Sequence, residues 1–86
     1  MPTISRFLGI LIAMYWREHG PPHFHARYGE HEATVYVHSG EVWEGQLPTR
    51  VRGLVKEWAQ LHQSELSDNW DRCAHNLVPN QIDPLE

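Results

Sequence analysis

The chain has 86 residues, which leaves room for one domain, because two would each be too small to bury a core unaided. Hydrophobic residues make up 41% of the chain and charged residues 21%, a composition that excludes global disorder. Seven Lys and Arg against eleven Asp and Glu give a net charge of −4, which excludes a protein that coats nucleic acid or an anionic membrane through its overall charge.

The first 47 residues predict a meander of β-strands. Short runs of β-branched and aromatic residues are separated there by Gly, Pro and Ser at close intervals, which is typical of strands joined by turns. Residues 3–7 form the first predicted strand, and residues 10–16 form the second, after a break at Gly9. Gly20-Pro21-Pro22 then predicts a stiff extended corner, because two prolines in a row fix the backbone and remove two hydrogen-bond donors.

Residues 23–28 and 31–38 are predicted to pair as a β-hairpin, because the two-residue connection Gly29-Glu30 suits a tight turn. Counting back from that turn places His23 opposite Tyr36 and separates two faces. The apolar face, which we expect to lie on the core, carries Phe24, Ala26, Tyr28, Ala33, Val35 and Val37. The polar face carries His23, His25, Arg27, Glu32, Thr34, Tyr36 and His38.

From Pro48 the spacing of apolar residues changes from two to about 3.6, so residues 48–75 are predicted to be helical. The first helix is predicted to bury one apolar stripe, formed by Val51, Leu54, Val55, Trp58, Ala59 and Leu61. A second segment over residues 66–74 is predicted to bury Leu66, Trp70, Cys73 and Ala74. The pattern between residues 61 and 67 fits either a bend or a continuous helix.

These elements predict one domain of the α+β class over residues 1–86. An antiparallel sheet of about four strands in meander order, ending with a short strand over residues 41–44, is expected to pack against the helical half. Residues 76–86 are expected to form an extended C-terminal arm. The strands at 3–7 and 41–44 are candidate sheet edges that nothing in the sequence protects, so pairing with a second copy is open.

The cysteine count and the apolar runs predict a cytoplasmic location. A lone Cys73 cannot form an internal disulfide, so the chain does not resemble the small secreted domains that bridges hold together. Its apolar runs are too short to cross a bilayer, and the first residues lack the features of a secretory signal. We therefore expect no membrane partner.

The densest group of polar functional side chains lies in residues 18–25, and it permits a metal site. Among the seven histidines of the chain, His19, His23 and His25 have a spacing that can bring three imidazoles to one space. Three such ligands can hold a divalent metal such as zinc and leave one coordination position open. One hypothesis is therefore a His-rich metal-binding domain.

A second hypothesis uses the same face of the hairpin to cleave RNA without a metal or any other cofactor. Cleavage of a phosphodiester needs a general base, a general acid and a cation that stabilises the developing negative charge. His23 and His25 can divide the acid and base roles, and Arg27 can supply the cation. Tyr36 can donate a proton or stack on an unpaired base.

A third hypothesis assigns no chemistry to these residues. Arg27 then pairs with Glu32 across the hairpin, Tyr36 covers His23, and the histidines fill a half-polar sheet surface. In that case the chain is a non-catalytic protein-interaction module.

Several segments of the chain resemble one family. The most specific of them reads Pro-Pro-His-Phe-His-Ala over residues 21–26, and others occur at residues 39–42, 45–48 and 57–62. The chain is similar to the bacterial domain of unknown function 4160. The resemblance implies a small cytoplasmic bacterial protein that is often encoded beside another small protein, in the manner of toxin and antitoxin pairs. It also places His19, His23 and His25 on histidine positions of the family.

The interpretation that combines these observations is one member of a toxin-antitoxin-like two-protein module, with a metal-independent ribonuclease centred on His23 and His25. Its expected partners are a small protein encoded by a neighbouring gene and RNA. The metal site and the interaction module remain the alternatives. All site hypotheses depend on the hairpin register, because a shift of one residue would turn both histidines into the core.

Overall fold

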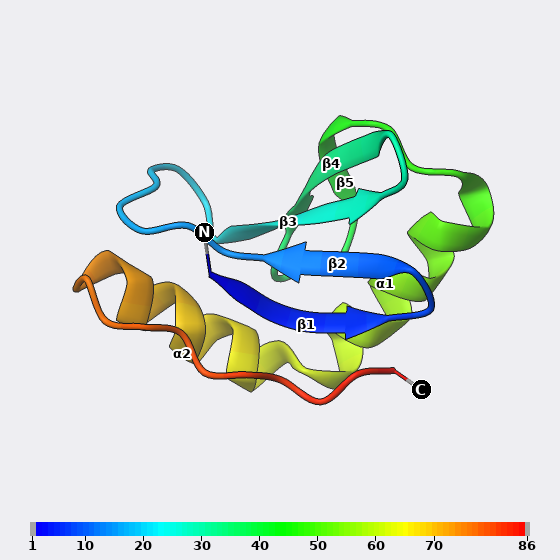
Figure 1. Cartoon of the computed structure of the whole chain (residues 1–86). Helices are drawn as coiled ribbons and strands as arrows, with labels where there is room; N and C mark the ends of the chain where they lie inside the picture. The colour runs from blue at the N-terminus through cyan, green and yellow to red at the C-terminus, as the bar shows by residue number, and fades with distance from the viewer. Residues whose placement is uncertain (1, 86) are drawn as a thin grey trace.

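The computed structural model describes residues 2–85 and confirms an α+β fold (Figure 1). The chain forms one antiparallel sheet whose strands follow the chain order β1-β2-β3-β4-β5. The strands are β1 (Thr3–Phe7), β2 (Ile10–Ala13), β3 (His23–Tyr28), β4 (His31–Tyr36) and β5 (Val42–Gly45). Two helices follow, α1 (Thr49–Leu61) and α2 (Gln63–Ala74). The sheet therefore has five strands where the sequence predicted about four, in the predicted meander order.

The hairpin of β3 and β4 has the predicted register. Tyr28 pairs with His31, and each following pair agrees, ending with His23 opposite Tyr36. The faces follow from this register: Phe24 and Val35 are completely buried, while Arg27 is exposed. Strand β2 is shorter than predicted and ends at Ala13, so the chain leaves the sheet earlier and a long loop over residues 14–22 connects β2 to β3.

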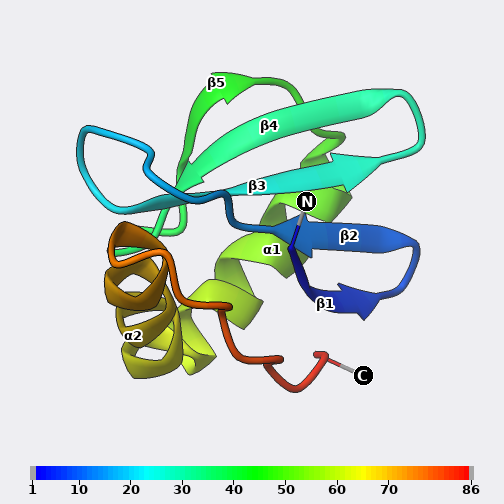
Figure 2. The same cartoon turned by 60° about the vertical axis from the view of Figure 1, so that its left-hand side comes forward.

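Both helices lie on one side of the sheet, and α2 lies toward the end at which β3 begins (Figure 2). Trp58 of α1 is the largest fully buried side chain, and its ring contacts those of Phe7 and Phe24 at centroid distances of 5.5 and 5.7 Å. Burial of such large apolar side chains is the main term that stabilises a domain of this size. The opposite face of the sheet carries the polar side chains of the hairpin.

The helical half bends at His62, whose φ of −121° and ψ of 34° end α1 and precede α2. The second helix begins at Gln63, three residues earlier than predicted. Two predicted core residues are wrong, because Leu61 is 65% exposed beside the bend and Ala74 is exposed at the end of α2. Asn69, a polar residue that the apolar pattern does not reveal, is buried instead.

The C-terminal arm over residues 76–85 has no helix or strand and lies against α2 and β1 (Figures 1 and 2). The backbone N–H of Ile82 donates to the carbonyl of Ile4 at 2.8 Å, and the Ile82 side chain is buried. The Asn69 side chain bonds both backbone groups of Asn80. The arm thus covers part of the outer edge of β1, which the sequence had left unprotected. Neither helix within residues 2–85 is long and apolar enough to cross a membrane.

Candidate functional site

The loop over residues 14–22 brings a carboxylate to the polar face of the sheet. After Ala13 the chain turns away, and it returns through two residues with left-handed backbone, Arg17 with φ of 59° and Gly20 with φ of 95°. Glycine adopts such a φ without cost, whereas an L-residue such as arginine does so rarely. This path directs the side chain of Glu18 toward the first residues of β3.

Glu18 meets two histidines from β3. Its Oε1 lies 2.6 Å from His25 Nε2 and 3.1 Å from His23 Nε2. The side chains are 30% exposed for Glu18, 16% for His25 and 5% for His23. Within residues 2–85 these three side chains form the one group whose potential metal-ligand atoms converge, all within 4.8 Å of one another.

His23 belongs to the polar face, as predicted, and yet it is buried. Its ring packs against Trp70 of α2 at a centroid distance of 4.9 Å and against the edge of Trp43 of β5 at 5.4 Å. Its Nδ1 lies 2.9 Å from the carbonyl oxygen of Pro21. The predicted corner at Pro21 and Pro22 thus supplies a hydrogen-bond partner for this ring.

Both nitrogens of His23 face hydrogen-bond acceptors. A backbone carbonyl only accepts, and an ionised carboxylate only accepts. Neutral imidazole has one N–H donor, so Nδ1–H can serve Pro21 while the lone pair of Nε2 is left facing the Glu18 oxygen. Such an arrangement is satisfied if a proton lies between Nε2 and Oε1, on either the ring or the carboxyl group, or if both atoms bind a metal cation. The same Glu18 oxygen faces His25 at 2.6 Å, so a cation could gain three ligands here if the carboxylate and this ring moved slightly apart.

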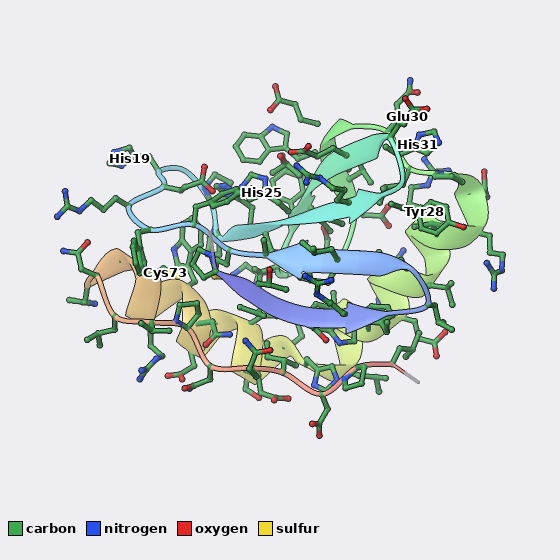
Figure 3. The ribbon with its side chains drawn as sticks, in the orientation of Figure 1. His19, His25, Tyr28, Glu30, His31 and Cys73 are labelled. Atoms are coloured by element: carbon green, nitrogen blue, oxygen red, sulfur yellow. The ribbon has the colours of Figure 1, made fainter. Side chains whose placement is uncertain are left out.

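The structure does not bring His19 to this group. Its side chain is exposed at the tip of the loop and points away from His25 (Figure 3). Glu18 occupies the place that the sequence hypothesis gave to His19. The sequence does contain a signal for Glu18, because this carboxylate precedes His23 by five residues and His25 by seven. Adjacent loop residues point in different directions, however, and the sequence does not reveal whether Glu18 or His19 faces the sheet.

Arg27 and Tyr36 lie on the same face but outside the convergent group. The Arg27 Nη2 lies 3.3 Å from Glu32 Oε1, which is the cross-strand pair expected from the register. Tyr36 stacks on Trp43 with 12° between the ring planes. A small hollow beside the group is lined by Leu11, Ala13, Tyr15, His25, Ala26, Arg27 and Glu32.

The other histidines lie away from the convergent group. His31 is at the far end of the β3–β4 hairpin (Figure 3), and His38 is exposed. His62 and His75 directly follow the last residues of α1 and α2.

Two side chains away from Glu18, His23 and His25 have shifted pKa values. Burial raises the pKa of the Cys73 thiol, so it lacks the thiolate character of a nucleophile. The hydrogen bond from Lys56 and its charge lower the pKa of the exposed Glu41. Neither contributes to the convergent group.

Most of the chain matches one known family of proteins. The model of a family described as Domain of unknown function (DUF4160) matches residues 9–71. The chain belongs to this family. The DUF4160 match confirms the sequence resemblance, and it contains Glu18, His23, His25 and both tryptophans that pack against His23. Searches among curated proteins and among solved structures gave no significant match.

Proposed function

We propose that the protein binds one divalent transition-metal ion, such as zinc, through Glu18 Oε1, His23 Nε2 and His25 Nε2. The observation that carries this proposal is the environment of His23, whose two ring nitrogens both face acceptors. A metal ion bound by the three side chains, with Glu18 and His25 moved slightly apart from their 2.6 Å contact, satisfies this arrangement without an added proton.

The donor set and its surroundings agree with known metal chemistry. Imidazole nitrogen and carboxylate oxygen are common zinc ligands, and they also suit iron, nickel and copper. Histidine ligands usually donate their other ring N–H to a carbonyl or carboxylate, which fixes the ring orientation. The Pro21 carbonyl at 2.9 Å from His23 Nδ1 has the position of such a partner. Three protein ligands leave at least one position for water or a ligand.

The test is a calorimetric titration of the tag-free protein with zinc, which measures the number of ions bound per chain and the binding affinity. We expect one zinc per chain, and we expect His25→Ala to weaken binding by more than about 100-fold, because it removes a ligand itself and not merely a partner of a ligand. His31→Ala is the matched control, since His31 is an exposed histidine of the same hairpin. Binding that His31→Ala abolishes and His25→Ala preserves would contradict the proposal, as would a folded wild type that takes up no zinc.

A second candidate is RNA cleavage without a metal, as the activity of one member of a toxin-antitoxin-like pair. The small hollow beside His25 favours it, because Tyr15, His25 and Arg27 are all among the residues that line this space. A base would take the proton of a 2′-hydroxyl, whose oxygen attacks phosphorus to form a cyclic phosphate. An acid would protonate the departing 5′-oxygen. The buried position of His23 makes this candidate the weaker one, because its side chain is only 5% exposed and its Nε2 already contacts Glu18.

Cleavage of an oligoribonucleotide in the presence of a chelator distinguishes the two candidates. The second candidate requires cleavage that survives the chelator, is lost in His25→Ala and in Arg27→Gln, and is retained in His38→Ala. Coexpression with the protein encoded by the neighbouring gene should then relieve growth arrest caused by the wild-type chain. A chain that cleaves nothing in chelator and leaves growth unaffected would rule this candidate out.

A further inference from the structure

The loop that carries Glu18 is fastened to the opposite end of the sequence. Trp16 Nε1 donates to the carbonyl oxygen of Leu77 at 3.0 Å. Arg17 Nε donates to the side-chain oxygen of Asn76 at 2.8 Å. These two bonds hold the residues directly before Glu18, and they reach across 61 and 59 positions of the chain. They lie outside the group of potential metal ligands.

Both residues of the second bond have unusual backbone. Arg17 has φ of 59° and Asn76 has φ of 61°, in the left-handed region. Asparagine tolerates this region better than most residues, whereas for arginine it is uncommon. Such conformations persist when surrounding contacts determine them, and they are concentrated at ligand-binding sites. For Asn76 these contacts are the backbone hydrogen bonds that end α2, from Asn76 to Cys73 and from Leu77 to Arg72. The bond from the Arg17 side chain then fastens the Glu18 loop to this fixed turn.

Helix α2 supports the group at a second point. Its Trp70 packs on the ring of His23, and Asn76 and Leu77 lie just beyond its last turn. The helix therefore contacts one histidine directly and holds the Glu18 loop through the following turn. A displacement of this turn would move the carboxylate while His25, paired within the sheet, stayed in place.

We propose that Asn76 and Arg17 are positioning residues for Glu18, and that the turn after α2 sets the affinity of the site for its metal. This inference rests on the proposed metal binding. A carboxylate already held in its binding position loses less conformational freedom when the ion binds. The smaller entropy loss makes binding of the ion tighter. Neither Asn76 nor Arg17 contacts the ion.

Asn76→Gly tests the inference, because glycine suits the left-handed backbone and the replacement removes the side chain that carries the acceptor oxygen. We expect about tenfold weaker zinc binding, the lower end of the loss seen when a partner of a metal ligand is removed, because Asn76 acts on Glu18 through Arg17. Asn76→Asp retains an acceptor oxygen at the same place and should bind zinc at least as tightly as wild type, because its added negative charge also favours a nearby cation. Thermal unfolding of the metal-free variants shows whether the fold is unchanged.

A double-mutant cycle with Glu18→Gln separates positioning from a general loss of structure. If Asn76 acts through the Glu18 carboxylate, Asn76→Gly should weaken zinc binding less than about twofold once that carboxylate is gone. An equal loss in both backgrounds would overturn the inference. So would wild-type affinity in Asn76→Gly. If the wild type binds no zinc, the proposed function fails, and the positioning role fails with it.

A second pair of variants guards against unfolding of Asn76→Gly. Arg17→Asn removes the donor, and asparagine suits the left-handed backbone. Leu8→Asn is the control, because it introduces asparagine at another exposed residue with left-handed backbone, in the β1–β2 turn. Removal of a positive charge near a cation site should by itself strengthen binding. Weaker binding in Arg17→Asn, with wild-type affinity in Leu8→Asn, therefore supports positioning. Unchanged or stronger binding in Arg17→Asn contradicts it.

Discussion

Asn69 illustrates how one buried polar side chain fastens the C-terminal arm. Its amide nitrogen donates to the carbonyl of Asn80 at 2.9 Å, and its oxygen accepts the backbone N–H of Asn80 at 2.8 Å. The side chain is 1% exposed, so its polar atoms depend on these two bonds. With Asn80 held in this way, Ile82 lies beside β1, where its side chain is buried.

Replacement of Asn69 should loosen this arm. We expect Asn69→Ala to lower the free energy of unfolding by about 2 kcal/mol, because it removes two hydrogen bonds and leaves the backbone of Asn80 unpaired. Asn80→Ala is the control, since only the backbone of Asn80 takes part, and it should change stability by less than about 0.5 kcal/mol. Urea denaturation measures both, and equal effects would contradict the account of the arm.

At this scale the sequence predicts part of the candidate site. His23 and His25 lie on one face, as the two-residue repeat of a strand requires, and the register depends on a short turn that can be recognised locally. Sequence alone does not predict whether Glu18 or His19 faces the two histidines. This choice depends on the backbone of Arg17 and on bonds to Asn76 and Leu77, which no local pattern reveals.

Among the elements, strand β5 approaches β4 unusually closely. A Cβ atom on Gly45 would lie 2.2 Å from the carbonyl oxygen of Glu32 and 2.9 Å from the Cα of Ala33, and Gly45 has φ of 85°. Both features require glycine, because backbone atoms cannot move aside as a flexible side chain can. The register between β4 and β5 shifts next to this point, between Thr34 and Val35.

Two glycine replacements should therefore change stability in opposite directions. Gly45→Ala is expected to destabilise the fold by more than about 2 kcal/mol through strain and collision with β4. Gly53 of α1 has open space around its Cα, so Gly53→Ala should stabilise the fold by up to about 1 kcal/mol through helix propensity. Thermal unfolding compares them, and a neutral Gly45→Ala would show that the two strands can separate without cost.

The elements themselves were predicted better than their ends. The change of apolar spacing at Pro48 correctly separates strands from helices. The end of β2 and the bend at His62 have long-range contacts nearby. The loop over residues 14–22 is bonded to the start of the C-terminal arm, and Gln63 bonds the carbonyl of Val37. Local propensity contains no information about such partners.

Over the whole molecule, the candidate site lies where four separate parts of the chain meet. The β2–β3 loop contributes Glu18, β3 contributes both histidines, and β5 and α2 contribute the tryptophans that enclose His23. The fold thus surrounds a convergent set of metal-ligand atoms with aromatic side chains on one side and leaves His25 beside a small hollow on the other. Surroundings of low polarity strengthen the attraction between a cation and its ligands.

The most direct test of the account is a crystal structure of the zinc-loaded protein with anomalous diffraction at the zinc edge. We expect one anomalous peak per chain, within about 2.0–2.2 Å of Glu18 Oε1, His23 Nε2 and His25 Nε2, while His23 Nδ1 still donates to Pro21. Zinc bound only at exposed histidines such as His31 or His38 would contradict the account. So would a zinc-saturated crystal in which Glu18 still bonds both imidazoles directly.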